Sequence, residues 1–206
     1  GSNTKLGFFL LTVLLFAIKS YWAYKTKFNL GISDSMQQFL LAFNTLPGAL
    51  VFLGIALYFR GRLSYWLMIL INFLLSTWLF ANILYYREFA DFITFNIIKG
   101  SGAASNNLGK SLIGIIKPTD FLVYADVIIL IVLLAAHFIR IDMRYFKVRY
   151  AMMITMIGFV LFGANLAMAE KDRPQLLTRT FDNNYIVKYL GLQAYTIYDG
   201  VKTTHN

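Results

Sequence analysis

The sequence predicts an all-α membrane protein, a bundle of five membrane-spanning helices. Of its 206 residues, 58% are hydrophobic and only 14% are charged, which is too apolar a composition for one water-soluble globule of this size. Five apolar runs each come near the ~20 residues that a helix needs to cross ~30 Å of hydrocarbon. Only helices and closed barrels satisfy backbone polar groups in lipid, and the runs lack the alternation of barrel strands. The predicted spans are residues 6–24, 39–58, 63–86, 121–139 and 150–168.

Basic residues predict the orientation of these spans. The connecting segments on the N-terminal side contain seven Lys or Arg residues in 18 positions, whereas those on the other side contain 11 in about 85. Cytoplasmic loops carry an excess of Lys and Arg, so we expect a cytoplasmic N-terminus and an extracellular C-terminus. The formal charge of +9 is therefore interpreted as a topology signal, and nucleic acid is not an expected partner.

Three segments make up the predicted domain organisation. Residues 1–3 are expected to be a disordered remnant of cloning, because the chain does not begin with Met. Residues 4–169 form the five-span domain, whose second span is expected to kink at Pro47. Residues 170–206 are expected to be an extracellular juxtamembrane linker leading to a domain outside this chain.

Short amphipathic helices are predicted on the extracellular side. Residues 87–99 place apolar side chains among polar ones in a pattern suited to a helix lying in the membrane interface. Residues 182–191 are interpreted in the same way, with Gly191 ending the helix. Pro118 opens the fourth span, with Thr119 or Asp120 as its cap.

Each predicted span carries one polar side chain at a similar depth. Lys19 and Asp126 each lie five residues from the outer end of their span, which places both ~7.5 Å inside the membrane. Asn44, Asn82 and Asn165 fall within about one helical turn of this level. Polar groups at such a depth are costly, so we expect a compensating interaction.

Three interpretations of this polar layer remain open. In the first, Lys19 and Asp126 snorkel outward while the asparagines form hydrogen bonds between helices. Alternatively, the groups converge on a water-accessible pocket in the outer leaflet. In that pocket Lys19 and Arg87 would hold a lipid phosphate, and Asp126 or Asp91 a glycerol hydroxyl. An ion or proton path is a third and weaker reading, because the inner halves of the spans are largely apolar.

No catalytic or metal-binding motif is recognisable in the sequence. It contains no cysteine, and two histidines cannot build a zinc site by themselves. Neither the Gly-x-Ser-x-Gly nor the His-Glu-x-x-His pattern occurs. We therefore expect no catalytic residue, no metal site and no cofactor within this chain.

Several strings resemble one family. Residues 165–191, NLAMAEKDRPQLLTRTFDNNYIVKYLG, and 195–203, YTIYDGVKT, closely resemble the segment after the fifth transmembrane helix of lipoteichoic acid synthases. These enzymes polymerise glycerol phosphate in Gram-positive bacteria. IKSYW (18–22), ANILYYREFADFIT (81–94) and KPTD (117–120) also look like this family.

The resemblance implies a bacterial cell-membrane protein with an extracellular, sulfatase-like catalytic domain beyond this chain. In the family that domain carries a threonine nucleophile and a manganese or similar divalent ion, and takes glycerol phosphate from phosphatidylglycerol. Expected partners are phosphatidylglycerol, other anionic lipids and the catalytic domain itself, and this fragment alone should be inactive. Whether the full-length protein is a polymerising synthase or a primase stays open.

We expect this domain to anchor and orient the catalytic domain and to bind lipid or polymer in its outer-leaflet half. The alternative is a passive anchor or protein-interaction module that binds no lipid substrate. The candidate headgroup-binding residues are Lys19, Asn82, Tyr86, Arg87, Asp91 and Asp126. The candidate linker and docking residues are Asp172, Arg173, Pro174, Arg179 and Asp182.

Overall fold

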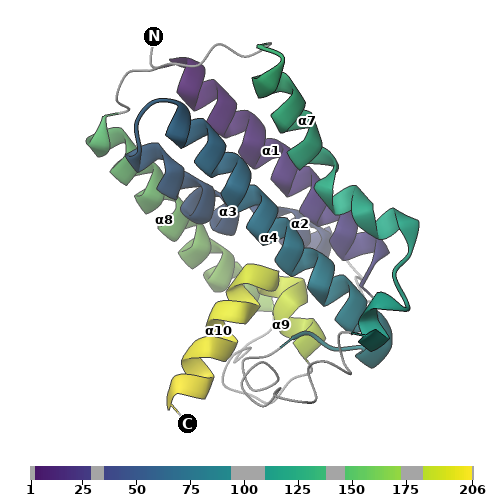
Figure 1. Cartoon of the computed structure of the whole chain (residues 1–206). Coiled ribbons are helices and arrows are strands. Elements are labelled where there is room, and N and C mark those ends of the chain that lie inside the picture. Colours follow the sequence, from purple (N-terminus) through teal and green to yellow (C-terminus); the bar gives the residue numbers. More distant parts are fainter. Residues whose placement is uncertain (1–2, 29–34, 94–109, 138–146, 173–182, 206) are drawn as a thin grey trace.

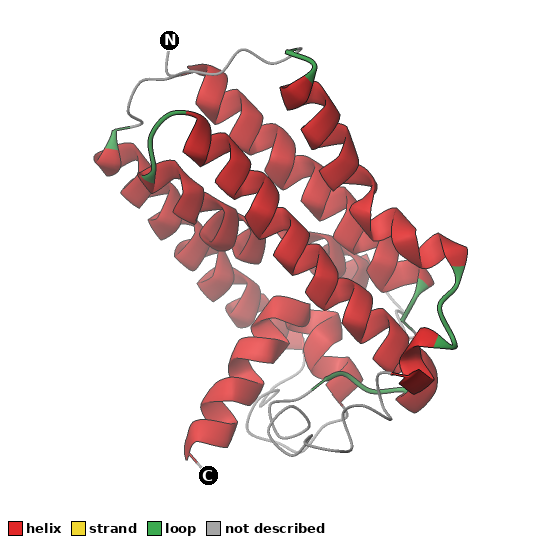
Figure 2. Ribbon diagram, in the orientation of Figure 1, coloured by secondary structure: helices red, strands yellow, loops and turns green. Residues whose placement is uncertain are grey.

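The computed structural model describes residues 3–28, 35–93, 110–137, 147–172 and 183–205. These residues form helices joined by turns and loops, with no strand among them (Figure 2). Five helical stretches are long and apolar enough to cross a membrane, which confirms the predicted all-α, five-span fold class. They are Lys5–Thr26, Gln37–Tyr58, Arg62–Phe89, Pro118–Ala135 and Val148–Ala169.

The candidate spans pack side by side in one bundle (Figure 1). Helix α1 (Asn3–Thr26) contacts both α4 (Arg62–Phe89) and α7 (Ala125–Ala135), which also contact each other. Helix α3 (Thr45–Gly54) packs between α1 and α8 (Val148–Asp172). Figure 1 shows α7 and α8 on opposite sides of this bundle, so the fold has an α1–α4–α7 side and an α3–α8 side.

The second predicted span is interrupted rather than continuous. It consists of α2 (Ser35–Phe43), α3 and a 3-10 turn, η1 (Ile55–Tyr58). The interruption falls at Asn44, three residues before Pro47. A proline ring clashes with the carbonyl group four residues earlier, here that of Phe43, and this explains why α2 ends there. The α-helix is therefore interrupted close to the position where a kink was expected, one turn ahead of the proline itself.

A close approach between α3 and α8 depends on glycine. A Cβ atom added to Gly158 of α8 would lie 2.8 Å from Cγ2 of Val51 and 3.3 Å from Cβ of Leu50. One turn away along the same contact, a Cβ on Gly54 would lie 3.7 Å from Cγ2 of Ile154. In a membrane no hydrophobic effect drives helices together, so their association depends on close packing, which small residues at the contact allow.

Helix α4 ends differently from the prediction. The segment 87–99 was expected to be a separate interfacial helix, but Arg87–Phe89 continue α4 and Ala90 ends it in the left-handed conformation, φ 56°. Phe92 then turns inward and is buried against the rings of Phe28 and Tyr86. The prediction of a helix starting at residue 87 is wrong, because this aromatic side chain enters the core instead of the interface. Residues 94–99 lie outside the described part of the chain.

The fourth span begins before its predicted start. A 3-10 helix, η2 (Pro118–Tyr124), precedes α7. The N-cap residue is Lys117 instead of the expected Thr119 or Asp120. Asp120, the third residue of the first turn, accepts the backbone N–H of Lys117 at 2.8 Å, as the carboxylate of a capping box does. Helix α7 ends at Ala135, short of the predicted residue 139, and the last two of those predicted residues lie outside the described part.

Two helices cover the end of the bundle opposite to the N-terminus (Figure 1). Helix α9 (Asn183–Leu190) confirms the predicted short helix, and Gly191 ends it with φ 94°. Helix α10 (Leu192–His205) follows at once and was not expected. We call the unit of α9, Gly191 and α10 the hairpin. The end of the bundle that the hairpin covers is called the α10 end. Several apolar residues of the hairpin, including Val187 and Tyr195, are buried in the core at that end.

Candidate functional site

A buried polar cluster joins α1, α4 and α7. Nζ of Lys19 donates to Oδ1 of Asp126 at 2.9 Å, to Oδ1 of Asn72 at 3.0 Å and to Oγ of Ser76. Nδ2 of Asn72 donates to the other carboxylate oxygen of Asp126 at 2.9 Å. The Lys19 and Asp126 side chains are each only 5% exposed. All three N–H donors of the ammonium group are therefore used, and both carboxylate oxygens accept a hydrogen bond. Each charged group of the cluster thus has its partners within the protein.

This intramembrane cluster answers part of the polar-layer question. Lys19 and Asp126 do not snorkel outward, because they are buried and bound to each other. Asn72 and Ser76, which the depth argument left aside, supply the bridging groups. Their spacing of four residues on one helix face was the available signal, since residues four apart are neighbours on a helix.

A second ionic cluster lies at the end of α4. The guanidinium of Arg87 donates to both carboxylate oxygens of Asp120 at 2.7 Å, and to the carbonyl oxygen of Ile115 at 2.9 Å. Nζ of Lys27 lies 3.1 Å from the same carboxylate and donates to Oγ1 of Thr119 at 2.6 Å. Asp120 is fully buried, whereas Arg87 is 20% and Lys27 10% exposed. We call this the interfacial cluster.

The remaining candidate headgroup residues stabilise the turn after α4. Asn82 accepts the backbone N–H of Ile93 at 2.9 Å and donates to the carbonyl oxygen of Trp78 at 3.0 Å. Oδ1 of Asp91 accepts the N–H of Phe92 at 2.8 Å, and the ring of Tyr86 packs on Phe92. The six candidates thus divide among three places, and the structure does not bring them into one pocket.

Three spans hold the hairpin against the bundle. The hydroxyl of Tyr24 in α1 accepts the backbone N–H of Leu192 at 3.1 Å. Nε1 of Trp78 in α4 donates to Oγ1 of Thr196 at 3.0 Å. Asn44, at the break in the second span, donates from Nδ2 to the carbonyl oxygen of Lys188 at 3.4 Å.

Close packing reinforces these hydrogen bonds. A Cβ atom on Gly191 would lie 3.0 Å from Oδ1 of Asn44, so the turn of the hairpin sits directly on the break of the second span. The ring of Tyr195 lies 5.8 Å from that of Phe92, and burial raises the pKa of its hydroxyl, with Asp91 adding to the rise. Tyr195 therefore stays neutral and packs as an aromatic core residue.

The candidate docking residues lie elsewhere. Asp172 is the last residue of α8, so it ends a helix where it was expected to cap one. Arg173, Pro174, Arg179 and Asp182 lie outside the described residues. In the described part of the chain, no three or more His, Cys, Asp or Glu residues are grouped so as to hold a metal ion.

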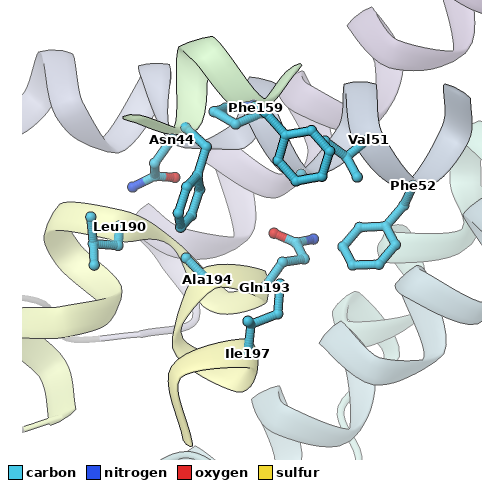
Figure 3. Close-up of a pocket in the computed structure, with 11 residues that line it drawn as sticks. Asn44, Val51, Phe52, Phe159, Leu190, Gln193, Ala194 and Ile197 are labelled. Carbon is cyan, nitrogen blue, oxygen red and sulfur yellow. The ribbon is translucent and has the colours of Figure 1, made fainter. Parts of the chain in front are cut away.

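An apolar pocket of about 180 Å³ lies between α3, α8 and the hairpin (Figure 3). Figure 3 shows the amide of Gln193 lying between the rings of Phe52 and Phe159. The lining residues are Asn44, Pro47, Gly48, Val51, Phe52, Phe159, Phe162, Leu190, Gln193, Ala194 and Ile197. Sequence reasoning missed this pocket, because one of its walls comes from α10, which was not expected.

Comparison with known proteins identifies the family. The family model described as "Lipoteichoic acid synthase N-terminal domain" matches residues 2–206. The chain is 50% identical to "Lipoteichoic acid synthase 1" and 43% identical to "Lipoteichoic acid synthase 2", both from Bacillus subtilis, over 97% and 96% of its length. It is 38% identical to "Lipoteichoic acid synthase" of Staphylococcus saprophyticus over 98% of its length.

The chain spans about a third of the length of these relatives, from 30% to 31%. No solved structure matches it. A family model that covers nearly all of the chain, together with relatives of such high identity, agrees with the five-span fold and with the strings that resemble this family. The chain therefore belongs to the family of lipoteichoic acid synthase N-terminal domains.

Proposed function

We propose that this chain is the membrane domain of a lipoteichoic-acid-synthase-type glycerol phosphotransferase, and that it anchors and orients an extracellular catalytic domain of the full-length protein. Its N-terminus lies in the cytoplasm and its α10 end faces the cell exterior. The distribution of Lys and Arg supports this direction, because the loops on the N-terminal side are the richer in basic residues.

The docked hairpin is the observation that carries the proposal. Tyr24, Trp78 and Asn44 come from three different spans, and each forms a hydrogen bond to the hairpin. A segment attached at three separate points has a fixed position and direction relative to the bundle. Whatever follows α10 then leaves the membrane along a defined path, which a passive anchor on a flexible linker would not provide.

The chemistry belongs to the catalytic domain. By family resemblance, that domain supplies the nucleophile and the divalent metal site and takes glycerol phosphate from phosphatidylglycerol. The present chain, incubated alone with labelled phosphatidylglycerol, should transfer no glycerol phosphate.

Contact with anionic headgroups is the second part of the proposal. Arg87 and Lys27 bring two positive charges to one carboxylate, that of Asp120, so the interfacial cluster keeps one net positive charge. This surplus, at the end of α4 and partly exposed, would attract the phosphate of phosphatidylglycerol or another anionic lipid. Lys19 and Asp126 neutralise each other and take no part in this contact.

The orienting role is tested in the full-length protein with the double variant Tyr24→Phe/Trp78→Phe. Both substitutions keep an aromatic ring but remove a hydrogen bond to the hairpin. Polymer synthesis should fall several-fold at an unchanged protein level in the membrane.

The matched control is Tyr150→Phe/Trp66→Phe, which makes the same chemical changes at exposed side chains near the starts of α8 and α4. It should synthesise polymer at the wild-type rate. Wild-type synthesis by the hairpin variant would favour the passive anchor and count against the proposal.

A further inference from the structure

We infer that the second half of α10, residues 197–205, lies in the membrane interface as an amphipathic helix, with Ile197 and Val201 in contact with lipid acyl chains. The partner of this apolar face is the lipid leaflet at the α10 end. The orienting role proposed above rests on hydrogen bonds to the hairpin at Lys188, Leu192 and Thr196, all before this segment, so the two claims can fail separately.

The two faces of α10 differ in character. Ala194, Ile197 and Val201 follow one another at intervals of three and four residues, so they share one face of the helix. At 3.6 residues per turn, Asp199 and Lys202 project from the opposite side. Ala194 is buried, whereas Ile197 and Val201 are 51% and 53% exposed. The apolar face therefore continues beyond the part that the protein itself covers.

This apolar face borders the lipid-facing surface of the bundle. Ile197 lines the apolar pocket together with Phe52 of α3 and Phe159 of α8 (Figure 3). Phe159 is 60% exposed and belongs to an exposed apolar face of α8 that includes Val160. Since α8 is a candidate span, lipid acyl chains cover that face. Val201 lies about one helical turn beyond Ile197, so the same acyl chains reach both.

The direction of α10 fits an interfacial position. Figure 1 shows α10 running across the direction of α4 and α8, with its C-terminal end away from the bundle. Tyr24 and Trp78 hold only its first half, at Leu192 and Thr196. An interfacial helix lies in the plane of the membrane, whereas a span crosses that plane. The second half of α10 therefore extends sideways from the bundle, into the leaflet that surrounds it.

The level of α10 lies in the leaflet at the α10 end. Trp78, which is hydrogen-bonded to Thr196, comes 16 residues after Arg62, the first residue of α4. Phe159, which lines the pocket with α10, comes 11 residues after Val148, the first residue of α8. At 1.5 Å per residue these positions are about 24 Å and about 17 Å along helices that cross ~30 Å of hydrocarbon. Both are past the midplane.

The two faces of α10 then meet different layers of this leaflet. A helix with its side chains is about 10 Å wide. The face with Ile197 and Val201 lies among acyl chains, while the face with Asp199 and Lys202 reaches toward the headgroups. The apolar side chains lose contact with water, and the charged ones keep their hydration. The chain that follows α10 consequently starts at the level of the lipid headgroups.

Spin labels measure which environment each face meets. Residues 1–206 contain no cysteine, so Val201→Cys and Lys202→Cys each introduce one labelling site, once any cysteine beyond residue 206 of the full-length protein is replaced. The labelled protein is placed in nanodiscs of phosphatidylcholine and phosphatidylglycerol. Power saturation then compares collisions with oxygen, which concentrates among acyl chains, and with a water-soluble nickel chelate.

The expected result is an order of three positions. Val160→Cys, on the exposed face of α8, is the reference for contact with acyl chains. The ratio of oxygen to nickel accessibility should fall from Val160→Cys to Val201→Cys to Lys202→Cys. Although Val201 and Lys202 are neighbours in the sequence, their ratios should differ several-fold, because they lie on different faces of α10.

A charge on the apolar face tests whether lipid contact holds the helix in place. Val201→Asp should speed the hydrogen exchange of residues 199–205 several-fold in the same nanodiscs. Lys202→Asp introduces the same side chain one position along, on the polar face, and should leave this exchange unchanged. Exchange of α9 should be unchanged in both variants, which shows that the rest of the hairpin stays folded and docked.

Three results would overturn the inference. Free access of the nickel chelate to both labels would mean that α10 lies in water. Little access of either reagent to the Val201→Cys label would mean that a protein surface covers the apolar face, from the domain that follows or from a second copy. Equal exchange in Val201→Asp and Lys202→Asp would mean that lipid contact does not hold the helix.

Discussion

The α1–α4–α7 side of the bundle and the α3–α8 side are closed by different means. On the first side, Lys19, Asn72 and Asp126 form a buried cluster in which every charged group has its partners. On the second side, Gly158 lets α8 approach α3, and the contacts are apolar. Within the described residues, every charged group of the polar cluster has a partner, whereas the apolar side leaves a pocket.

This difference shows how the cost of burying polar groups in the membrane is compensated. A charge inside the membrane is costly, and here it is compensated within the protein, so that it fixes three helices in one arrangement. Buried charge in this domain therefore indicates architecture, and the functional candidates are the interfacial cluster, the docked hairpin and the pocket.

The largest effect is expected on the polar side. Lys19→Leu leaves the buried carboxylate of Asp126 without its counter-ion and should destabilise the fold by about 3–5 kcal/mol. Thermal unfolding in a mild detergent measures the change. Lys19→Leu/Asp126→Leu removes both charges and should recover much of the loss.

The exposed Lys25 provides the control, since Lys25→Leu removes a lysine from the same helix without touching the cluster. A Lys19→Leu variant that unfolds at the same temperature as the wild type would contradict the role given to the cluster. So would a double variant as unstable as the single one.

A smaller loss is expected at the turn of the hairpin. Gly191 has φ 94°, and a Cβ atom there would lie only 3.0 Å from Oδ1 of Asn44. Gly191→Ala should cost about 1–3 kcal/mol through backbone strain alone and should push the hairpin away from the break. Hydrogen exchange of α9 and α10 measures this undocking and should be faster in the variant.

Combining Gly191→Ala with Asn44→Ala separates the two causes. The second change removes the close contact but also the hydrogen bond to Lys188, so the double variant is compared with Asn44→Ala alone. The difference between these two, which reports the strained backbone, should be smaller than the effect of Gly191→Ala in the wild-type background. Unchanged exchange in Gly191→Ala would mean that the hairpin does not depend on this contact.

The smallest effect is expected on the apolar side. Gly158→Ala gains up to ~1 kcal/mol of helix propensity, but its Cβ would lie 2.8 Å from Cγ2 of Val51. Overpacking of this kind costs about 1–3 kcal/mol, so we expect a net loss near 1 kcal/mol. Gly163→Ala, in the same helix with nothing within 4 Å, should be neutral or stabilising. Equal behaviour of the two variants in thermal unfolding would refute the close-packing account.

The spans could be predicted from the sequence because length and hydropathy are local properties. The meeting of Lys19 with Asp126 was partly predictable, since both lie at one depth and buried charges need partners. Asn72 was left aside by the depth argument and Ser76 was overlooked, because serine and asparagine are common between membrane helices and carry no charge to mark them.

Other features depend on contacts that the sequence does not display. Arg87 was expected to face lipid, but its carboxylate partner, Asp120, lies 33 positions away in a segment interpreted only as a helix cap. Phe92 turned inward because a pocket of aromatic rings was available in the folded state. Helix α10 was missed because its apolar residues become recognisable as a buried face only once the bundle end is present.

Thiol labelling in cells tests the central claim, that the α10 end with its docked hairpin faces the cell exterior. The chain contains no cysteine, so Lys202→Cys on α10 and Arg62→Cys at the start of α4 each introduce a single thiol. A membrane-impermeant maleimide should label Lys202→Cys in intact cells and Arg62→Cys only after the membrane is opened. Labelling of Arg62→Cys but not of Lys202→Cys in intact cells would contradict the account.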